Sequence, residues 1–250
     1  YASWNWKANG AGSANTDGTV NSTVSANTTA GFSIVKYTGT GTNSDTVGHN
    51  LGTTPSMIIA KGLDAREWYV QHQAISSGTL NLESTGAATT NFSSGWINES
   101  PTSSVFSFTV GSGGTTNNVN NSGTDFIAYC FAEKRGFSKF GNYAPNGNAD
   151  GNFIYTGMSP AFVMIKNTNT TRDWVMYDNK RPIPNSASKV LEANTSDAES
   201  TLDLDIDLLS NGFKLRGAAG NINTGDGVNY IYMAFGQSIV GSNNTPCTAR

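Results

Sequence analysis

The stretch that decides the fold is Phe126-Ile127-Ala128-Tyr129-Cys130-Phe131, which returns as Tyr230-Ile231-Tyr232-Met233-Ala234-Phe235. Each copy follows an Asn-x-Asn motif, at residues 118–120 and 221–223. Landmarks at a nearly constant offset indicate an internal duplication of one folding unit, in which a side chain present in both copies is first a scaffold candidate. The other landmarks lie about 105 residues apart: Gly31-Phe32-Ser33 returns as Gly136-Phe137-Ser138, Pro55 and Lys61 return as Pro160 and Lys166, and Trp68 returns as Trp174.

Short runs in each copy alternate apolar and polar residues with the period of two expected of half-buried strands. No window of a dozen residues shows a convincing helical stripe, although 202–209 is ambiguous. Six or seven short strands per repeat are typical of a two-layer antiparallel fold. We therefore predict an all-β protein of two tandem antiparallel β-sandwich (jelly-roll-like) modules. The predicted strands are 32–37, 57–61, 68–72, 80–83, 105–110, 126–131, 153–156, 162–166, 174–177, 190–192, 213–216 and 230–235.

The predicted organisation has three parts. Residues 31–135 and 136–250 are the two sandwich repeats, and the second ends in a polar tail. Residues 1–30 are predicted to be an N-terminal strand and a linker, because residues 7–30 are nearly all small and polar. The strand is expected at Tyr1-Ala2-Ser3-Trp4-Asn5-Trp6, which has the aromatic spacing of 126–131. It is either the end of an upstream module or a free-standing strand that pairs locally.

Composition excludes several classes of function. A net charge of −3 and a pI near 5.3 argue against nucleic-acid binding, which needs a basic surface to neutralise phosphates. No stretch approaches the roughly 20 apolar residues of a membrane-spanning helix. Cys130 aligns with Ala234 and is interpreted as a small buried residue, and Cys247 lies in the polar tail, so we expect two free thiols.

Catalytic motifs are missing. The two histidines, His49 and His72, align with Ile154 and Asp178, and the sequence contains no nucleophile elbow, zinc-protease motif or phosphate loop. The chain is therefore predicted not to be an enzyme and to need no cofactor, although a carboxylate pair such as Asp64 with Glu67 remains a glycosidase alternative.

Alternating carboxylates offer one metal hypothesis. Asp203, Asp205 and Asp207 would share one face of a strand, and calcium prefers several oxygen ligands. The favoured interpretation is a solvated acidic face, or a helical turn, without a metal.

Two tryptophans are candidates for ligand contact. Trp174 lies in sequence near Asp173, Asp178 and Arg181, which suggests a ring for sugar stacking with polar groups around it; its duplication favours a core role instead. Trp96 has no twin and lies in a polar run, so we predict an exposed contact in a loop. The candidate ligand-binding residues are Trp96, Trp174, Asp173, Asp178 and Arg181.

As a set, the repeated motifs resemble modules of tail and fibre proteins from phages of marine bacteria and cyanobacteria. The resemblance rests on 31–39, Gly48-His49-Asn50-Leu51-Gly52, 126–132 and 136–141, with 153–157, 174–178 and 210–214 in the second repeat. In that family such modules often follow laminin-G or concanavalin-like lectin domains. The resemblance implies a location on the outside of a phage particle and identifies no catalytic or binding residue.

Three functions follow as expectations. The first is a non-enzymatic tail or fibre protein that contributes to host-surface attachment through glycans. The second is a purely structural virion building block of the fibre, tail or capsid decoration, and the third is a polysaccharide-degrading tail enzyme. The expected partners are other virion protein subunits, with a homo-oligomer, preferably a trimer, and host glycans. No nucleic acid and no membrane insertion are expected.

Overall fold

The computed structural model describes residues 3–89, 95–98, 100–109, 114–181, 185–201, 205–225 and 227–236. In this part of the chain the regular structure is β-strand apart from one short helix, α1 (Asn117–Asn120). The chain divides into two compact units, each with its own hydrophobic core. Unit 1 comprises Tyr1–Asn81 and Ala88–Glu133, and unit 2 comprises Lys134–Arg250 together with the segment Leu82–Ala87.

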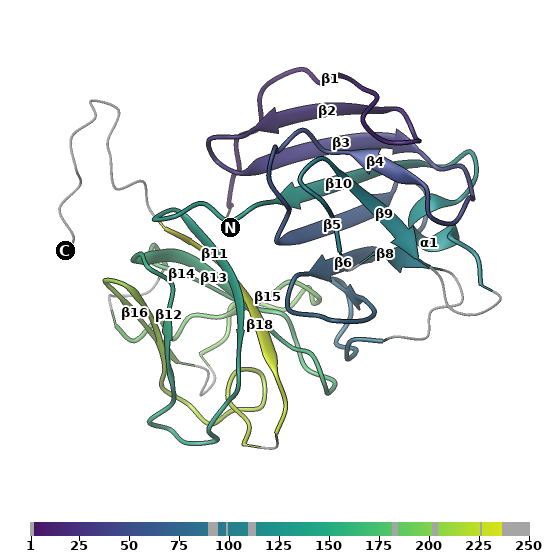
Figure 1. Ribbon diagram of the computed structural model, residues 1–250. Coiled ribbons are helices and arrows are strands. Elements are labelled where there is room, and N and C mark those ends of the chain that lie inside the picture. Colours follow the sequence, from purple (N-terminus) through teal and green to yellow (C-terminus); the bar gives the residue numbers. More distant parts are fainter. Residues whose placement is uncertain are drawn as a thin grey trace, which may run out of the picture. The chain divides into compact units, whose positions relative to one another are not determined.

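Unit 1 is a two-layer antiparallel sandwich (Figure 1). The larger sheet has the strand order β1-β2-β3-β10-β5-β6-β7, and the smaller sheet has the order β4-β9-β8. Side chains from both sheets, among them Val35, Phe106 and Phe126, form one buried cluster. The strands are β1 (Ser13–Asn15), β2 (Ser22–Asn27), β3 (Phe32–Thr38), β4 (Thr46–Gly48), β5 (Met57–Gly62), β6 (Trp68–His72), β7 (Leu80–Asn81), β8 (Trp96–Ile97), β9 (Val105–Thr109) and β10 (Asp125–Phe131).

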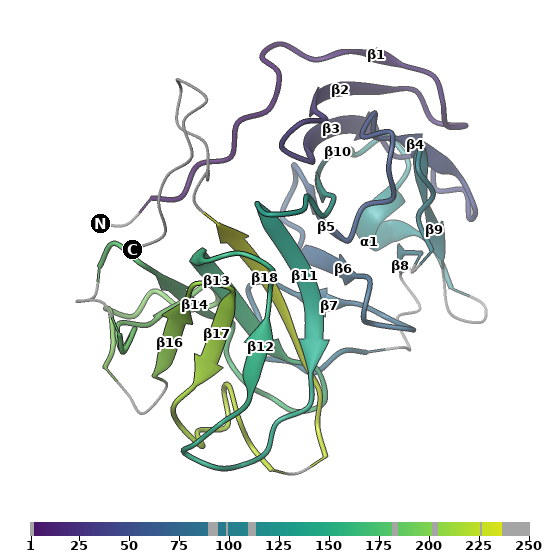
Figure 2. The same cartoon turned by 60° about the vertical axis from the view of Figure 1, so that its left-hand side comes forward.

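Unit 2 is built in the same way (Figure 2). Its larger sheet has the order β11-β18-β13-β14-β15, and its smaller sheet has the order β12-β17-β16. Val163, Tyr177 and Phe213 are among the residues of its core. The strands are β11 (Ser138–Tyr143), β12 (Phe153–Tyr155), β13 (Pro160–Asn167), β14 (Val175–Asp178), β15 (Leu191–Glu192), β16 (Ile206–Leu209), β17 (Gly212–Leu215) and β18 (Tyr230–Gly236).

The two units share one strand order. The series β3-β10-β5-β6-β7 of unit 1 corresponds to β11-β18-β13-β14-β15 of unit 2, and β4-β9-β8 corresponds to β12-β17-β16. The all-β, antiparallel sandwich fold predicted from the sequence is thereby confirmed. A common strand order is what an internal duplication predicts, and the duplication itself remains an interpretation of the sequence.

All twelve predicted strands are present, with ends that differ by a few residues at most within the described part of the chain. The predicted end of one strand, Val110, lies outside the described residues. Six further strands were not predicted: β1, β2, β4, β8, β11 and β16.

The prediction of a linker before residue 31 is wrong. Strands β1 and β2 form a hairpin-like pair there, and β2 extends the larger sheet by pairing with β3 along its whole length. Within the described residues 3–6 there is no strand. Instead, the ring of Trp6 packs edge-on against Phe131, with centroids 5.9 Å apart.

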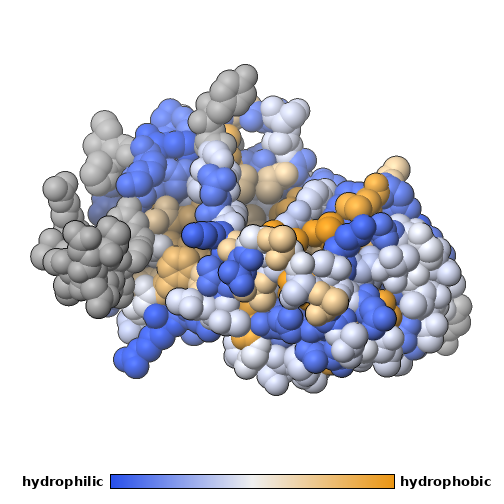
Figure 3. All heavy atoms as spheres, turned by 90° about the horizontal axis from the view of Figure 1, so that it is seen from above, coloured by the Kyte–Doolittle hydropathy of each residue, from blue (hydrophilic) through white to orange (hydrophobic). Residues whose placement is uncertain are grey.

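Figure 3 shows one face, on which hydrophilic and neutral residues predominate. No helix in the described part of the chain has the length and apolarity needed to cross a membrane. Cys130 is buried and free, as predicted, and burial raises the pKa of its thiol to about 12. Cys247 lies outside the described residues.

Candidate binding surface

The outer face of the smaller sheet of unit 2 carries exposed aromatic side chains. Ile154 and Phe213 point into the core, so their neighbours in the alternating pattern of β12 and β17 point outward. Phe153 is 44% exposed and Tyr155 is 65% exposed. Single exposed apolar side chains are common, but neighbouring ones on the same face of a sheet form a patch that is a candidate for ligand contact. This sheet is therefore the first place to look for a ligand.

Both rings lie beside glycine backbone. A Cβ atom at Gly212 would come within 2.8 Å of the ring of Phe153, and one at Gly157 would lie 3.5 Å from the hydroxyl of Tyr155. Gly157 has a φ of +74°, a conformation that strongly favours glycine. Glycine at these two positions lets the aromatic rings lie close to the sheet.

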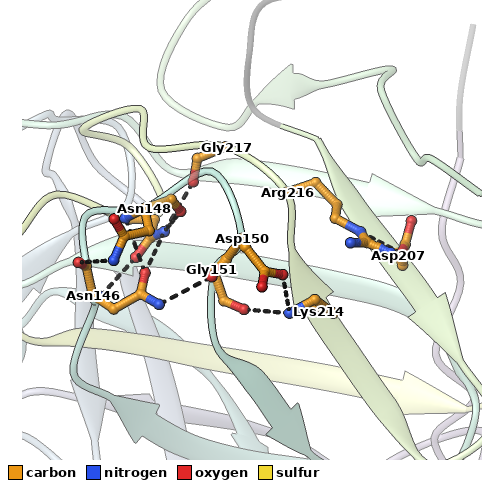
Figure 4. Close-up of polar contacts among 9 residues, drawn as sticks. Asn146, Asn148, Asp150, Gly151, Asp207, Lys214, Arg216 and Gly217 are labelled. Carbon is orange, nitrogen blue, oxygen red and sulfur yellow. Dashed lines mark hydrogen bonds and ion pairs between the residues drawn. The ribbon is translucent and has the colours of Figure 1, made fainter.

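Charged side chains accompany the aromatic ones. Lys214 lies directly opposite Phe153 in the β-ladder, and its Nζ contacts Asp150 Oδ1 at 2.8 Å and the carbonyl of Gly151 at 2.7 Å (Figure 4). Lys214, which donates a hydrogen bond to Asp150 and lies beside it as a cation, lowers the pKa of that carboxyl. Arg216 pairs with Asp207 through both its Nε and a terminal nitrogen. The surface thus has both signs of charge.

A loop rich in amides borders these charges. The buried side chain of Asn223 accepts hydrogen bonds from the backbone N–H groups of Asn146 (2.9 Å) and Gly147 (3.3 Å). Its amide nitrogen donates to the carbonyls of Asn148 (2.8 Å) and Gly217 (2.9 Å) (Figure 4). One fully buried side chain therefore fixes a loop whose own amides face solvent.

The same buried amide occurs in unit 1. Asn120 accepts from the N–H of Thr40 and donates to the carbonyl of Thr42, as Asn223 does with residues 146 and 148. The amide contact is therefore shared scaffold, whereas the loop that it holds differs between the units.

Within the described residues, unit 1 has no equivalent of this aromatic surface. Val47 pairs with Phe106 as Ile154 pairs with Phe213, so Thr46 and Gly48 take the places of Phe153 and Tyr155. A Cβ atom at Gly48 would lie 1.8 Å from Asn15 Oδ1, and the N–H of Thr19 donates to Thr46 Oγ1. Residues 15–20 therefore cover this strand in unit 1.

Unit 1 has a polar groove of its own. Its volume is about 390 Å³, and it is lined by Asn9, Ala11, Ser13, Val24, Ser25, Ala26, Thr28 and Asn50. These side chains supply hydroxyl and amide groups but no aromatic ring. The outer face of β12 and β17 combines aromatic, amide and charged groups, so it is the stronger candidate.

Trp96 does not lie in an exposed loop, and that prediction is wrong. It belongs to β8, pairs with Thr109 of β9, and is only 6% exposed. Trp174 is 1% exposed, and its backbone N–H donates to Asn194 Oδ1. The burial of Trp174 agrees with the core alternative. Neither ring offers a face on which a sugar can stack in this structure.

The three polar candidates belong to two separate contacts. Asp178 and Arg181 form an ion pair of 2.6 Å, and Arg181 also contacts Glu199 at 3.0 Å. Asp173 accepts from the amides of Asn194 and Asn221. Burial alone would raise the pKa of Asp178, but hydrogen bonds from Arg181 and from two backbone N–H groups outweigh it and lower the pKa. These residues hold loops in place.

Both histidines bind backbone groups. His49 is buried, and its Nδ1 accepts from the N–H of Leu51 while Nε2 contacts the carbonyl of Thr102. His72 accepts from the N–H of Ala74, just as Asp178 accepts from the N–H of Lys180 at the equivalent turn. The equivalence of His72 and Asp178 is thus structural.

The acidic residues considered for catalysis and for metal binding are engaged as well. Asp64 pairs with Arg66, and Glu67 accepts from Tyr69 and Asn81. Asp207 pairs with Arg216, whereas Asp203 lies outside the described residues. Within the described ranges no group of three or more His, Cys, Asp or Glu side chains is placed to hold a metal ion.

Sequence reasoning identified β12 as a strand but missed its two outward aromatic residues. Three consecutive large apolar residues, Phe153, Ile154 and Tyr155, cannot all face one core from a strand, because successive side chains alternate. That run was the available signal.

Comparison with known proteins places the chain in a family. No curated protein and no solved structure matches it. A family model described as a domain of unknown function, DUF7483, matches residues 1–238. With nearly the whole chain matched, this protein belongs to the DUF7483 family.

Proposed function

We propose that the chain is a non-enzymatic protein of the outside of a phage particle, in its tail or fibre, and that it binds glycans of the host surface. The exposure of Phe153 and Tyr155 beside Lys214 is the observation that carries the glycan part. The phage setting rests on the resemblance of the repeated motifs to tail and fibre modules. The binding surface is the outer face of β12 and β17 with the loop at 146–150.

The chemistry of this surface suits a carbohydrate. Aromatic faces pack against the apolar faces of sugar rings, and polar groups around them supply directional hydrogen bonds to hydroxyls. Asn148 and Asp150 offer such groups from a fixed loop, and Lys214 and Arg216 can meet carboxylates or phosphates of acidic bacterial polysaccharides. The surface is open rather than enclosed, so each contact is weak. Several copies on one particle would supply the affinity through multivalency.

The test is a glycan array with host polysaccharides, probed with the full chain, with Tyr155→Ala and with Phe153→Ala. We expect binding by the wild type and a loss of about tenfold or more in each variant, which corresponds to about 1.4 kcal/mol. Leu63→Ala is the matched control, because Leu63 is an exposed apolar side chain (60%) of unit 1.

Three other results would point elsewhere. Silence of the wild type across host glycans would remove the attachment function and leave the structural building block. Equal loss in Leu63→Ala would show that binding is not specific to this surface. Release of reducing ends from a host polysaccharide would instead identify a tail enzyme.

A further inference from the structure

Unit 2 contains a buried lysine that is satisfied by a segment from far away in the sequence. Lys166, at the end of β13, is fully buried, and its Nζ donates to the carbonyls of Asn167 (2.8 Å) and Thr85 (3.1 Å). The backbone N–H of Arg172 donates to the same Thr85 carbonyl at 2.9 Å. Thr85 belongs to the segment Leu82–Ala87, which is part of unit 2. The carbonyl of Thr85 therefore acts as a plug between two donors.

The loop that contains Thr85, residues 79–89, has a counterpart at residues 190–200. A bridge between Thr79 and Thr89 closes the first loop, and a bridge between Val190 and Ser200 closes an equally long second loop. Each loop follows the same short strand of its sheet, β7 or β15. Ser196 thus occupies the position of Thr85.

The receiving site also has a counterpart, in unit 1. Lys61 and Arg66 correspond to Lys166 and Arg172, and Lys61 likewise donates to the carbonyl of the next residue, at 2.6 Å. Here the carbonyl of Asp64 takes the place of Thr85, because it accepts from Lys61 Nζ (2.8 Å) and from the N–H of Arg66 (2.8 Å). The turn that supplies it, residues 63–65, is exposed throughout.

The two loops differ in exposure, and so do the two lysine sites. Residues 84–88 are half-buried, whereas residues 195–199 are exposed. Lys166 and Trp174 are buried, whereas Lys61 and Trp68 are partly exposed and Leu63, next to them, is 60% exposed. The site at Lys166 is therefore filled by the loop that contains Thr85. The equivalent loop, at 190–200, is exposed over residues 195–199, and the equivalent site, at Lys61, is filled by the carbonyl of its own turn.

We propose that the loop Ala193–Ala198 of one copy docks on the Lys61 site of a second copy, where the carbonyl of Ser196 replaces that of Asp64. Charge is one argument for this pairing: the exposed loop has Asp197 where the docked loop has Gly86, and the site contains Lys61 and Arg66, of which Arg66 is paired with Asp64 in the closed turn. The interface is heterologous, so copies join head to tail and form rings or open filaments. This inference is independent of glycan binding.

Charge reversal tests it. Sedimentation velocity of the full chain up to about 200 µM should show association that grows with concentration. Asp197→Arg and Arg66→Glu should each weaken it by at least about tenfold, since each places like charges together. A 1:1 mixture of the two variants should associate again, with the variants in alternating order, because both contacts between them pair opposite charges whereas contacts within one variant pair like charges. Lys7→Glu, at an exposed cation elsewhere in unit 1, is the control and should associate like the wild type.

Each other result overturns the proposal. These are a wild type that stays monomeric over this range, single variants that associate as the wild type does, and a mixture that does not recover association although both variants melt at the wild-type temperature. If Arg66→Glu unfolds, because Arg66 also contacts Asp64 and Asn117, Leu63→Asp replaces it, and loss of association in this folded variant is again required.

Discussion

Tyr37 and Tyr143 hold their units together in the same way. Each is buried, and each hydroxyl donates to a backbone carbonyl, Tyr37 to Val119 at 2.6 Å and Tyr143 to Ile222 at 2.8 Å. The ring of Tyr37 stacks on Phe126 at 5.3 Å, and that of Tyr143 stacks on Tyr230 at 5.1 Å. In both units, one tyrosine thus joins the larger sheet to the segment that precedes β10 or β18.

Removal of either hydroxyl should therefore destabilise one unit and leave the other unchanged. We expect Tyr37→Phe to cost unit 1, and Tyr143→Phe to cost unit 2, about 1–2 kcal/mol each, because a buried carbonyl loses its partner. Denaturant unfolding measures the loss of stability, and hydrogen exchange shows which unit has lost it. Tyr155→Phe, at an exposed hydroxyl, should change stability by less than about 0.5 kcal/mol. Equal effects of all three variants would contradict the assignment.

Trp174 and Tyr155 should respond in opposite ways to truncation. Trp174→Ala should cost about 3–5 kcal/mol, since it opens a cavity in the core of unit 2. Tyr155→Ala should leave the melting temperature nearly unchanged and reduce glycan binding. Thermal melts and array binding on the same samples measure both properties. A Trp174→Phe variant that folds and binds less well than Tyr155→Ala would restore the sugar-stacking role of Trp174.

The buried amide of Asn223 should couple stability to the proposed binding surface. Asn223→Ala leaves the N–H groups of Asn146 and Gly147 without their acceptor, and we expect a cost of about 2–4 kcal/mol and weaker glycan binding. Asn120→Ala is the matched control, because it removes the equivalent contact from unit 1. It should cost a similar amount and leave glycan binding intact at a temperature where both variants are folded.

Lys166 should make unit 2 more stable as the pH rises above 8. Burial lowers the pKa of Lys166 to about 8, from an ordinary value of 10.5 in the unfolded chain. Between these values the unfolded state binds more protons than the folded state, so the free energy of unfolding increases with pH. The neutral amine still has two N–H groups for its two carbonyl partners.

The measurement compares wild type with Lys166→Met. The difference between their unfolding free energies should grow by roughly 1–2 kcal/mol between pH 8 and pH 9.5 in favour of the wild type. A difference that stays constant or shrinks over this range would mean that the ammonium form is retained in the folded state.

Periodicity revealed the central strands because their burial is one-sided. Phe126–Phe131 and Phe32–Thr38 alternate between buried and less buried positions, and residues 57–60 are a short buried apolar run, whereas the order of these strands in the sheet was not predicted. Edge strands gave no such signal. Ser22–Asn27 has Val24 as its only large apolar residue, and it is a strand because β3 offers it a full row of backbone partners. Ser138–Tyr143 is likewise interrupted by polar residues and glycine.

The candidate surface could not be predicted from the sequence, because it depends on which of two equivalent strands is covered by another segment. Thr46 and Phe153 take equivalent places, yet residues 15–20 lie over the first strand, while the second keeps its aromatic residues exposed. A constant offset of 105 also aligns Tyr37 with Asn142, whereas the ladders align it with Tyr143. Contacts of this kind depend on register, which composition and spacing leave open.

The turns from Lys61 to Arg66 and from Lys166 to Arg172 differ in length, and protein engineering can use this difference. Four residues separate Lys61 from Arg66, whereas five separate Lys166 from Arg172. The shorter turn supplies the carbonyl of its own Asp64 to the lysine, whereas the longer turn leaves room for the carbonyl of Thr85 from another loop. One extra glycine in the first turn should therefore keep the Lys61 site free for the loop of another copy. Removal of one residue from the second turn should close the Lys166 site. The extent of polymerisation would then be set by a single codon.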